Sequence, residues 1–440
     1  MRMMLRKYWE RISGSFWFVP MLMAAAAIAL AQATIAFDSK ATDGWLHAQS
    51  WVYNGGAEGA TAMLSTIASS MITIAGVVFS MTLVALSLAS SQLGPRLLRT
   101  FMTDKTNQVV LGTFVATFLY SLMVLRAIRR ADEGIFVPHL SVAFGVILAV
   151  ASLGVLVYFI HHVAVSIQAD NVVARIGAEL TESIDRLFPE NTGKSLGEGS
   201  FTEAFGRDCC AIGASEDGYV QLIDSDALLA LAEEEDMVLR VERRPGQFVV
   251  KGSPLALGWP GGRVDEKIKA RIDGAFVLGS YRSPAQDVEF GINQLVEIAV
   301  CALSPGVNDP FTAIACADRL GAALACLAQR ESRPWRHHDA ENKLRLVTQP
   351  TSFGDMADAA FDQIRQYARS SAAVTLRLLE TIEVVAGFVV QDEDRAALRR
   401  QADMIARGSL EGLPEQEDRL AVDTRYRAAL HALALPGPQP

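Results

Sequence analysis

The chain has 440 residues, half of them hydrophobic, and a formal net charge of −9 at pH 7. This length exceeds that of a usual single domain. The charge is divided unevenly, since residues 1–170 hold 11 Lys and Arg against 8 Asp and Glu, whereas residues 171–440 hold 29 against 41. The acidic second part excludes the basic face that nucleic-acid binding requires.

Four apolar segments in residues 1–170 predict an all-α membrane domain. A helix rises 1.5 Å per residue, so about 20 residues cross a hydrocarbon core of roughly 30 Å. The predicted transmembrane spans cover about residues 16–37, 61–91, 107–128 and 138–165. The second span has no ionisable residue, and a turn with Arg96, Arg99 and Lys105 joins it to the third, which predicts a transmembrane hairpin.

The first span carries a second possible interpretation. Ala31, Gln32 and Ala33 match the small-residue pattern of a signal-peptidase site. The apolar run continues past that site to Phe37, which favours an uncleaved first helix. Cleavage after Ala33 would remove one span and leave the orientation of the others unchanged.

The basic residues predict the orientation of the spans, because cytoplasmic loops are enriched in Lys and Arg. A cytoplasmic N-terminus places seven basic residues inside and four outside, and four spans then return the C-terminal part to the cytoplasm. The inner set is Arg2, Arg6, Lys7, Arg11, Arg96, Arg99 and Lys105, and the outer set is Lys40, Arg126, Arg129 and Arg130. The five cysteines lack C-x-x-C spacing and are expected to be free thiols in a reducing compartment.

One face of the second span is small and weakly polar. Seven of its residues fall within about 80° of one another at 100° per residue. They are Ser65, Ser69, Thr73, Gly76, Ser80, Ser87 and Ser91. Helix packing is the favoured explanation, because small residues let helix backbones approach closely. The alternative is the water-exposed wall of a pore.

The second part of the chain predicts a cytoplasmic α+β portion. Residues 171–200 are expected to form an exit helix and a linker, residues 201–282 a β-rich barrel or sandwich, and residues 283–430 a helical module, with a disordered tail at 431–440. Ser283 to Gln286 form a capping box that predicts a helix start, and Asp309 is the predicted N-cap of the next helix. A basic loop is expected over residues 330–345.

Few residues in this portion point to chemistry. The β-rich runs resemble the half-repeats of lipoyl-type barrels, in which a modified lysine lies on a tight hairpin, and Lys267 is the candidate here. An adaptor or spacer role is the more usual one for such a barrel. Neighbouring histidines, as at His161 and His162, point about 100° apart on a helix and do not share a metal ion unaided. Without a nucleophile elbow, P-loop or paired carboxylates, no enzyme activity, cofactor or metal is predicted.

Four runs of the sequence carry a resemblance to a known family. They are FSMTLVALSLASSQLGPRLLRTFMTDKTNQVVLGTF, YFIHHVAVSIQA, GSYRSPAQDVEFGINQL and ALSPGVNDPFTA. With these runs the chain resembles, over about residues 5–430, a predicted bacterial membrane-protein family, domain of unknown function 2254. The resemblance implies a bacterial inner-membrane protein and brings no catalytic residues.

Two hypotheses about function remain open. The first is a homo-oligomeric channel lined by the Ser65–Ser91 face, with Ser80 near mid-membrane and with Arg126, Arg129 and Arg130 attracting anions at the outer side. The second is a non-conducting anchor whose cytoplasmic part senses a ligand or binds a partner. A proton-coupled transporter is disfavoured, because the span cores lack Asp, Glu and Lys.

Overall fold

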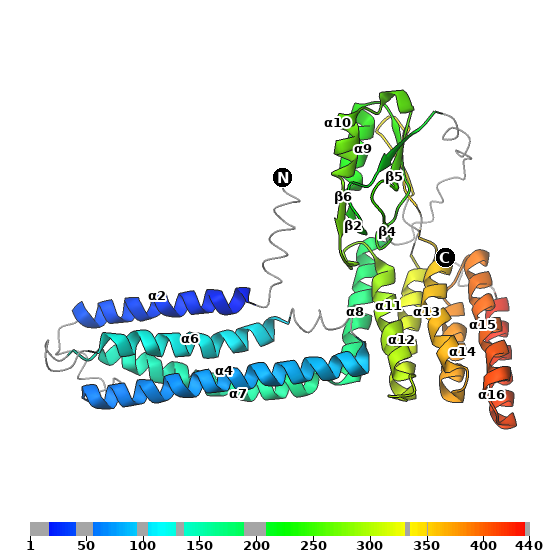
Figure 1. Ribbon diagram of the computed structural model, residues 1–440. Coiled ribbons are helices and arrows are strands. Elements are labelled where there is room, and N and C mark those ends of the chain that lie inside the picture. The colour runs from blue at the N-terminus through cyan, green and yellow to red at the C-terminus, as the bar shows by residue number, and fades with distance from the viewer. Residues whose placement is uncertain are drawn as a thin grey trace. The chain divides into compact units, whose positions relative to one another are not determined.

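The computed structural model describes residues 17–40, 56–94, 104–128, 136–188, 208–330, 335–349 and 351–435. It divides into two compact units, residues 1–171 and 172–440, which are described separately below (Figure 1). Several sequence predictions lie outside the described residues. These are the linker at 190–200, the basic residues Arg96, Arg99, Arg129 and Arg130, and the last five residues of the tail.

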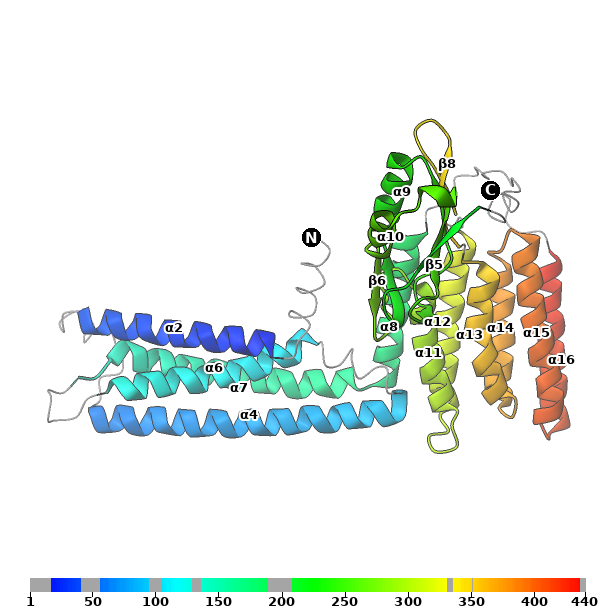
Figure 2. The same cartoon turned by 45° about the horizontal axis from the view of Figure 1, so that its top comes forward.

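The first unit is built from long apolar helices that run side by side (Figures 1 and 2). They are α2 (Phe18–Lys40), α4 (Ala57–Leu93), α6 (Lys105–Ala127) and α7 (His139–Ser166). Each coincides closely with one predicted span, and α2 continues through Ala33 to Lys40. Helix α6 contacts α2, α4 and α7, so it forms the centre of this bundle.

The interior of the first unit is aromatic and hydroxyl-rich. Tyr120, Phe114 and Phe159 are the largest fully buried side chains of this unit. The large apolar side chains on the outside are instead exposed, among them Val150 at 67% and Val157 at 64%. Such an apolar exterior is what a lipid-facing surface requires, because hydrocarbon solvates these side chains as well as a core does.

Five helices among the described residues are long and apolar enough to cross a membrane, one more than the sequence predicted. The fifth, α12 (Pro310–Ala328), belongs to the second unit, where it packs on α11, α13 and α14. More than half of its most apolar stretch is buried inside that unit. The predicted number of four spans is therefore not confirmed by length and composition alone.

The second unit contains a β-rich module with two small sheets. Its strands are β1 (Cys210–Gly213), β2 (Gly218–Ile223), β3 (Val238–Val241), β4 (Phe248–Val249), β5 (Pro254–Trp259), β6 (Phe276–Gly279), β7 (Arg336–His338) and β8 (Leu344–Val347). The five-stranded sheet has the order β1-β5-β3-β8-β7, with β3 and β8 parallel, and the three-stranded sheet has the order β4-β2-β6. Both sheets share one core, which includes Val220, Leu255 and Leu346.

The β-rich module differs from the predicted one in three ways. Two helices, α9 (Ser225–Glu234) and α10 (Glu266–Asp273), interrupt the strands, and the predicted barrel or sandwich is not confirmed. Strands β7 and β8 arise inside the predicted basic loop at 330–345, because Leu346 completes the core of the larger sheet. Lys267 is exposed on α10 and not on a hairpin, so it does not occupy the position of the modified lysine in lipoyl-type barrels.

The rest of the second unit is a two-layer stack of helices (Figure 2). Its helices are α8 (Ala169–Leu187), α11 (Val288–Ala302), α12, α13 (Phe353–Ala368), α14 (Ala372–Ala386), α15 (Asp392–Gly412) and α16 (Gln416–Ala434). Helices α11, α13 and α15 contact in sequence along one layer, and α12, α14 and α16 along the other. Leu180 of α8 packs on Gly291 of α11, so α8 closes one end of the stack.

Helix starts and ends in the stack partly follow the predictions. Asp309 caps α12 as predicted, accepting from the N–H groups of Phe311 and Thr312. The predicted capping box at Ser283 is wrong, because Gln286 bonds instead to both backbone groups of Ile223, and α11 begins after Asp287. The predicted tail is wrong for residues 431–434, which belong to α16.

Candidate functional site in the apolar helical bundle

The hydroxyl-lined face of α4 lies on the outside of the first unit. All seven of its predicted members are exposed. A Cβ built on Gly76 meets no atom within 4 Å, so this position has open space beside it. The face therefore packs against no other described helix of the same chain.

The opposite side of α4 holds the helix in the bundle. Ala60, Leu64, Ala68, Ala75 and Val78 are buried there, each at most 5% exposed. Small residues alternate with larger ones on this side, which permits the close helix contacts typical of membrane bundles. The sequence predicted a packing face on α4, and within one chain the packing side is this alanine-rich one.

A polar cluster fastens the bundle at the end where α2 stops and α7 begins. The Tyr120 hydroxyl donates to the Ser141 carbonyl at 3.0 Å and hydrogen-bonds the Thr34 hydroxyl at 3.1 Å. The Asp38 carboxylate accepts from the backbone N–H groups of Leu140 and Ser141. A carboxylate at this position satisfies the first N–H groups of α7 and is favoured by the helix dipole.

A second polar contact lies at the opposite end of the bundle. The Nε2 atom of His162 is 2.8 Å from Oδ2 of Asp104, whose Oδ1 accepts from the Thr106 N–H as the N-cap of α6. His162 also stacks on Tyr158, whereas His161 is exposed. The pair therefore joins α6 to α7. The sequence did not predict this contact, because Asp104 lies 58 residues away from His162.

Of the three predicted outer arginines, only Arg126 falls within the described residues. It is exposed in the last turn of α6.

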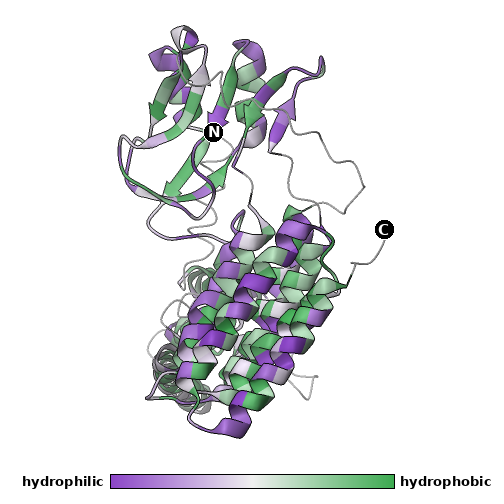
Figure 3. Cartoon of the chain, turned by 90° about the vertical axis from the view of Figure 1, so that its right-hand side faces the viewer, coloured by the Kyte–Doolittle hydropathy of each residue, from purple (hydrophilic) through white to green (hydrophobic). Residues whose placement is uncertain are grey.

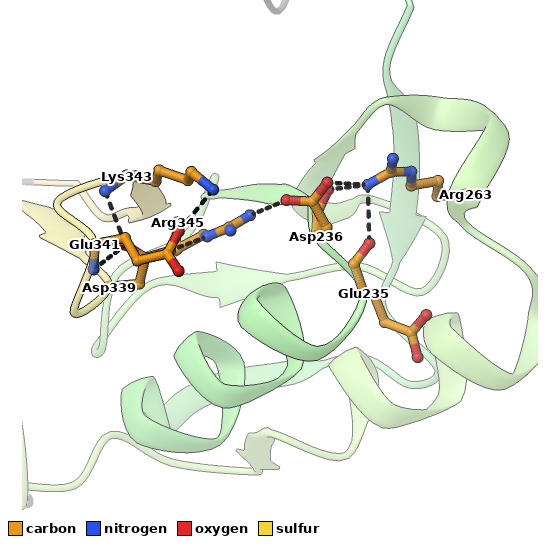
Figure 4. A network of polar contacts seen from close by, with 7 residues as sticks. All are labelled: Glu235, Asp236, Arg263, Asp339, Glu341, Lys343 and Arg345. Atoms are coloured by element: carbon orange, nitrogen blue, oxygen red, sulfur yellow. Dashed lines mark hydrogen bonds and ion pairs between the residues drawn. The ribbon is translucent and has the colours of Figure 1, made fainter.

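In the second unit, charged side chains of the β7–β8 hairpin bond to Asp236, which precedes β3 in the same sheet, and Asp236 in turn bonds Arg263 (Figure 4). Arg345 donates to Oδ2 of Asp339 at 2.7 Å and to Oδ1 of Asp236 at 2.9 Å, and Arg263 donates to the other Asp236 oxygen. Hydrogen bonds from Arg263 and Arg345 lower the pKa of Asp236 to about 2. Asp339 is thus an ion-pair partner of Arg345.

A buried ion pair precedes α11. Nε and Nη2 of Arg282 donate to the two Asp287 oxygens at 2.7 and 2.9 Å, and the Asp287 side chain is only 3% exposed. Burial raises the pKa of the Asp287 carboxyl, and the guanidinium of Arg282 opposes that rise. Gly246, at φ +91°, leaves room for the pair, because a Cβ there would collide with Asp287.

Across the described ranges, no three His, Cys, Asp or Glu side chains gather as a possible metal site. All five cysteines are free thiols, as predicted, and Cys316 is buried. Burial raises the pKa of the Cys316 thiol above its ordinary range, which disfavours the reactive thiolate.

A bundle of long helices with an apolar exterior, followed by a mixed α/β unit with its own buried core, is typical of a membrane protein. The model of the family described as "Predicted membrane protein (DUF2254)" matches residues 13–384, and the chain belongs to this family. Two similar proteins are the uncharacterized proteins Mb1321c of Mycobacterium bovis and Rv1290c of Mycobacterium tuberculosis. Each is 29% identical over 437 residues, which are 97% of this chain and 82% of the relative. No solved structure matches the chain.

Proposed function

We propose that the chain crosses the bacterial inner membrane four times, through α2, α4, α6 and α7, with both termini in the cytoplasm. The excess of basic residues on the inner side supports this orientation. Helix α12 is assigned to the soluble part, because it carries Asp318 and Arg319 and packs within the helix stack. Alkaline-phosphatase fusions test the topology: a fusion at Gly56 is expected to be active and a C-terminal fusion inactive. The reverse pattern would overturn it.

The proposed activity is conduction through a homo-oligomeric channel whose wall is the hydroxyl-lined face of α4. The observation that carries this proposal is the exposure of all seven residues of that face in the single chain. Hydroxyls that face hydrocarbon lose hydrogen bonds to water, so a second copy or a water-filled path is the favourable neighbour. Four helices enclose a path poorly alone, which is why several subunits are required. No reaction is assigned to the chain.

The first experiment asks whether the α4 face joins subunits. Gly76→Leu is expected to leave the single chain folded, because Gly76 has open space, and to lower the oligomer fraction of the purified protein in detergent. Gly154→Leu on α7 is the matched control, since Gly154 also has no atom within 4 Å of an added Cβ. Light scattering measures the mass of each variant. A wild-type protein that is strictly monomeric at all concentrations would contradict the proposal.

The second experiment asks whether the face lines a conducting path. Planar-bilayer currents of the wild type are compared with those of Ser80→Leu, which is expected to reduce conductance severely. Replacing Arg126, Arg129 and Arg130 by glutamine is expected to weaken the preference for anions, because a basic entrance raises their local concentration. Unchanged current in Ser80→Leu would mean that the face packs between helices and does not line the path.

The second candidate function is a membrane anchor whose soluble unit holds a partner. One observation favours it: α11–α12, α13–α14 and α15–α16 form three helical hairpins stacked in two layers, an arrangement that helical-repeat proteins use for binding. The end hairpin carries both hydrophilic and hydrophobic residues (Figure 3), and Leu410 and Leu420 are 60% and 51% exposed. Absence of current from folded wild type under voltage and tension would place this candidate first.

A further inference from the structure

The helix stack of the second unit has one end at which all three of its hairpins turn (Figures 1 and 2). Helices α12, α14 and α16 run in the same direction, because ion pairs join positions at similar distances from the helix starts. These pairs are Arg377 with Asp318 and Arg425 with Glu380. We name the shared end, formed by residues 303–309, 369–371 and 413–415, the turn end.

Helix α8 also starts at the turn end. Near the end of α8, Asp185 accepts from Arg330, which follows the last residue of α12 closely. Near the middle of both helices, a Cβ added to Gly177 would touch the side chain of Arg319. The two helices are therefore parallel and lie side by side. Phe311 precedes Arg319 by as many residues as the first residue of α8 precedes Gly177, so the first turns of the two helices are level.

The chain itself holds the start of α8 close to the membrane. Helix α7, the last proposed span, ends at Ser166, and α8 begins at Ala169. Three residues reach about 11 Å at most, and packed helices lie about 8–10 Å apart. The backbone of Phe311 is therefore within about 20 Å of the end of α7. The opposite end of the stack lies about 28 Å farther along α8, which has 19 residues.

The turn between α11 and α12 exposes apolar side chains at the turn end. Phe311 is 80% exposed, more than any other large hydrophobic side chain of the described residues, and Val307 is 39% exposed. Asp309 is the only ionisable residue in 303–311, and its carboxylate caps α12 by accepting from the N–H groups of Phe311 and Thr312. The turn therefore has an apolar tip whose one charge is already bonded to the helix start.

The segments of the second unit that lie outside the described residues join the helices of the stack at the opposite end. They follow the last residues of α8, α12 and α16 or precede the first residue of α13, and they are residues 189–207, 331–334, 350 and 436–440. None of them adjoins the turn between α11 and α12 in the chain. The membrane is the neighbour that the short connection from α7 supplies.

We propose that the turn between α11 and α12 inserts Val307 and Phe311 into the interfacial layer of the bilayer, close to the end of α7. Insertion removes the exposed apolar side chains from water. The third turn of the stack is excluded from this contact, because Glu411, Glu415 and Glu417 are exposed there and an anionic leaflet repels them. The proposal rests on the proposed topology, in which α7 is a span, and does not depend on conduction.

Spin-label accessibility in the full-length protein tests this contact. The four cysteines that are not buried are replaced by serine, and a nitroxide is attached to Val307→Cys or Phe311→Cys in vesicles of phosphatidylethanolamine and phosphatidylglycerol. Oxygen concentrates in the bilayer, whereas a nickel chelate stays in water. Relaxation by oxygen is expected to exceed relaxation by the chelate at least about threefold at both positions. Val384→Cys, 60% exposed at the opposite end of the stack, is the matched control and should favour the chelate.

A label in the span separates failure of this contact from failure of the topology. Val150→Cys, within α7 and 67% exposed, should favour oxygen. Preference for the chelate there would remove the span, and the proposal with it. With Val150 in the bilayer, a turn that favours the chelate as strongly as Val384 does would overturn the proposal. A turn shielded from both reagents would also overturn it, because protein would then cover Phe311.

A charge placed at the tip gives a second measurement. Phe311→Glu is expected to lower the oxygen-to-chelate ratio at Val307→Cys to about that of Val384→Cys, because a carboxylate keeps the turn in water. Val390→Glu, at an exposed apolar position of the opposite end, should leave the ratio unchanged. An unchanged ratio in Phe311→Glu would contradict the proposal. Size-exclusion profiles matching the wild type confirm that each variant is folded.

Discussion

The two units place polar and apolar side chains in opposite ways. In the first unit the large exposed side chains are apolar, while hydroxyls such as those of Thr117 and Ser152 bond to each other inside at 3.0 Å. In the second unit the core of the β-rich module is mostly aliphatic, and exposed charged groups form ion pairs, as between Arg427 and Asp423. The difference follows from the solvent. Water drives apolar surface inward, whereas hydrocarbon leaves hydroxyl bonds and close packing to hold helices together.

The hydroxyl-lined face of α4 departs from the pattern of its own unit. The large exposed side chains of the bundle are apolar, yet this face exposes five serines, a threonine and a glycine. In a bilayer such a face is better accommodated by another subunit or by water than by lipid. This contrast is the basis of the proposed channel wall.

The largest change in unfolding free energy is expected when the buried ion pair of the second unit, Arg282 with Asp287, is broken. Arg282→Met leaves the Asp287 carboxylate buried without its partner, which costs about 3–5 kcal/mol of unfolding free energy. The free energy is measured on the full chain by urea-dependent labelling of Cys316, a fully buried thiol of the same unit.

Arg427→Met provides the control for that measurement. Arg427 pairs with Asp423 on α16, but the two side chains are 76% and 45% exposed, and such surface pairs contribute about 0–1 kcal/mol. Equal losses of unfolding free energy in the two variants would contradict the prediction, because they would mean that buried and exposed ion pairs contribute equally to the stability of this unit.

The sequence predicted the helices of the first unit well, because length and hydrophobicity define membrane helices without knowledge of tertiary contacts. It predicted a β-rich region at residues 201–282, which holds β1 to β6, but not the contribution of β7 and β8. Strand β8 pairs with β3, and β7 pairs with β8, although α11 and α12 lie between β3 and β8 in the sequence, so local patterns do not reveal this pairing. The predicted start of α11 was wrong for the same reason. The side chain of Gln286 hydrogen-bonds the backbone of Ile223, 63 residues away, and does not cap the helix.

The candidate site was predicted in part. Helical periodicity placed seven small residues on one face of α4, but it did not reveal that the side toward α6 and α7 is the alanine-rich one. The pairing of His162 with Asp104 depends on the contact between α6 and α7. Such contacts between distant segments are the information that a single sequence lacks.

Glycines offer a smaller test of how tightly each unit is packed. A Cβ on Gly412 would collide with the backbone carbonyl of Arg369, so Gly412→Ala is expected to cost the second unit about 1–3 kcal/mol. Gly154 in α7 has open space, and Gly154→Ala should be neutral or stabilise by up to about 1 kcal/mol through helix propensity. Labelling of Cys316 reports the first change, and labelling of a cysteine placed at the buried Ser121 reports the second. A destabilising Gly154→Ala would reveal a neighbour on α7 that one chain does not show.

Two tyrosine hydroxyls allow the contribution of a hydrogen bond to stability to be compared between the first and the second unit. Tyr120→Phe removes a hydroxyl that bonds Thr34 and Ser141 in the bundle interior, and it is expected to cost about 1–2 kcal/mol. Tyr426→Phe removes a bond to Asp403 at 2.7 Å near the surface of the second unit and should cost about 0.5 kcal/mol. The same two cysteine reporters measure the losses. A smaller loss for Tyr120 than for Tyr426 would show that the polar cluster at the end of α2 does not hold the bundle together.

The smallest expected effect concerns a carboxyl group in the second unit and its dependence on pH. Burial, assisted by the nearby charge of Glu393, raises the pKa of Asp394 from 3.8 to about 6. The folded state therefore binds this proton more tightly than the unfolded state, and the stabilisation it brings is complete below about pH 4 and lost as the pH rises through 6. Partial exposure of the side chain limits the effect to about 1 kcal/mol.

Asp394→Asn should remove this loss of stability. The unfolding free energy of the variant, relative to that of the wild type, is therefore expected to rise between pH 4 and pH 7, as measured from urea midpoints by circular dichroism. Asp392→Asn, on the exposed side of the same helical turn, should show no such gain with pH. If both variants respond alike, the dipole of α15 and not burial governs these carboxylates.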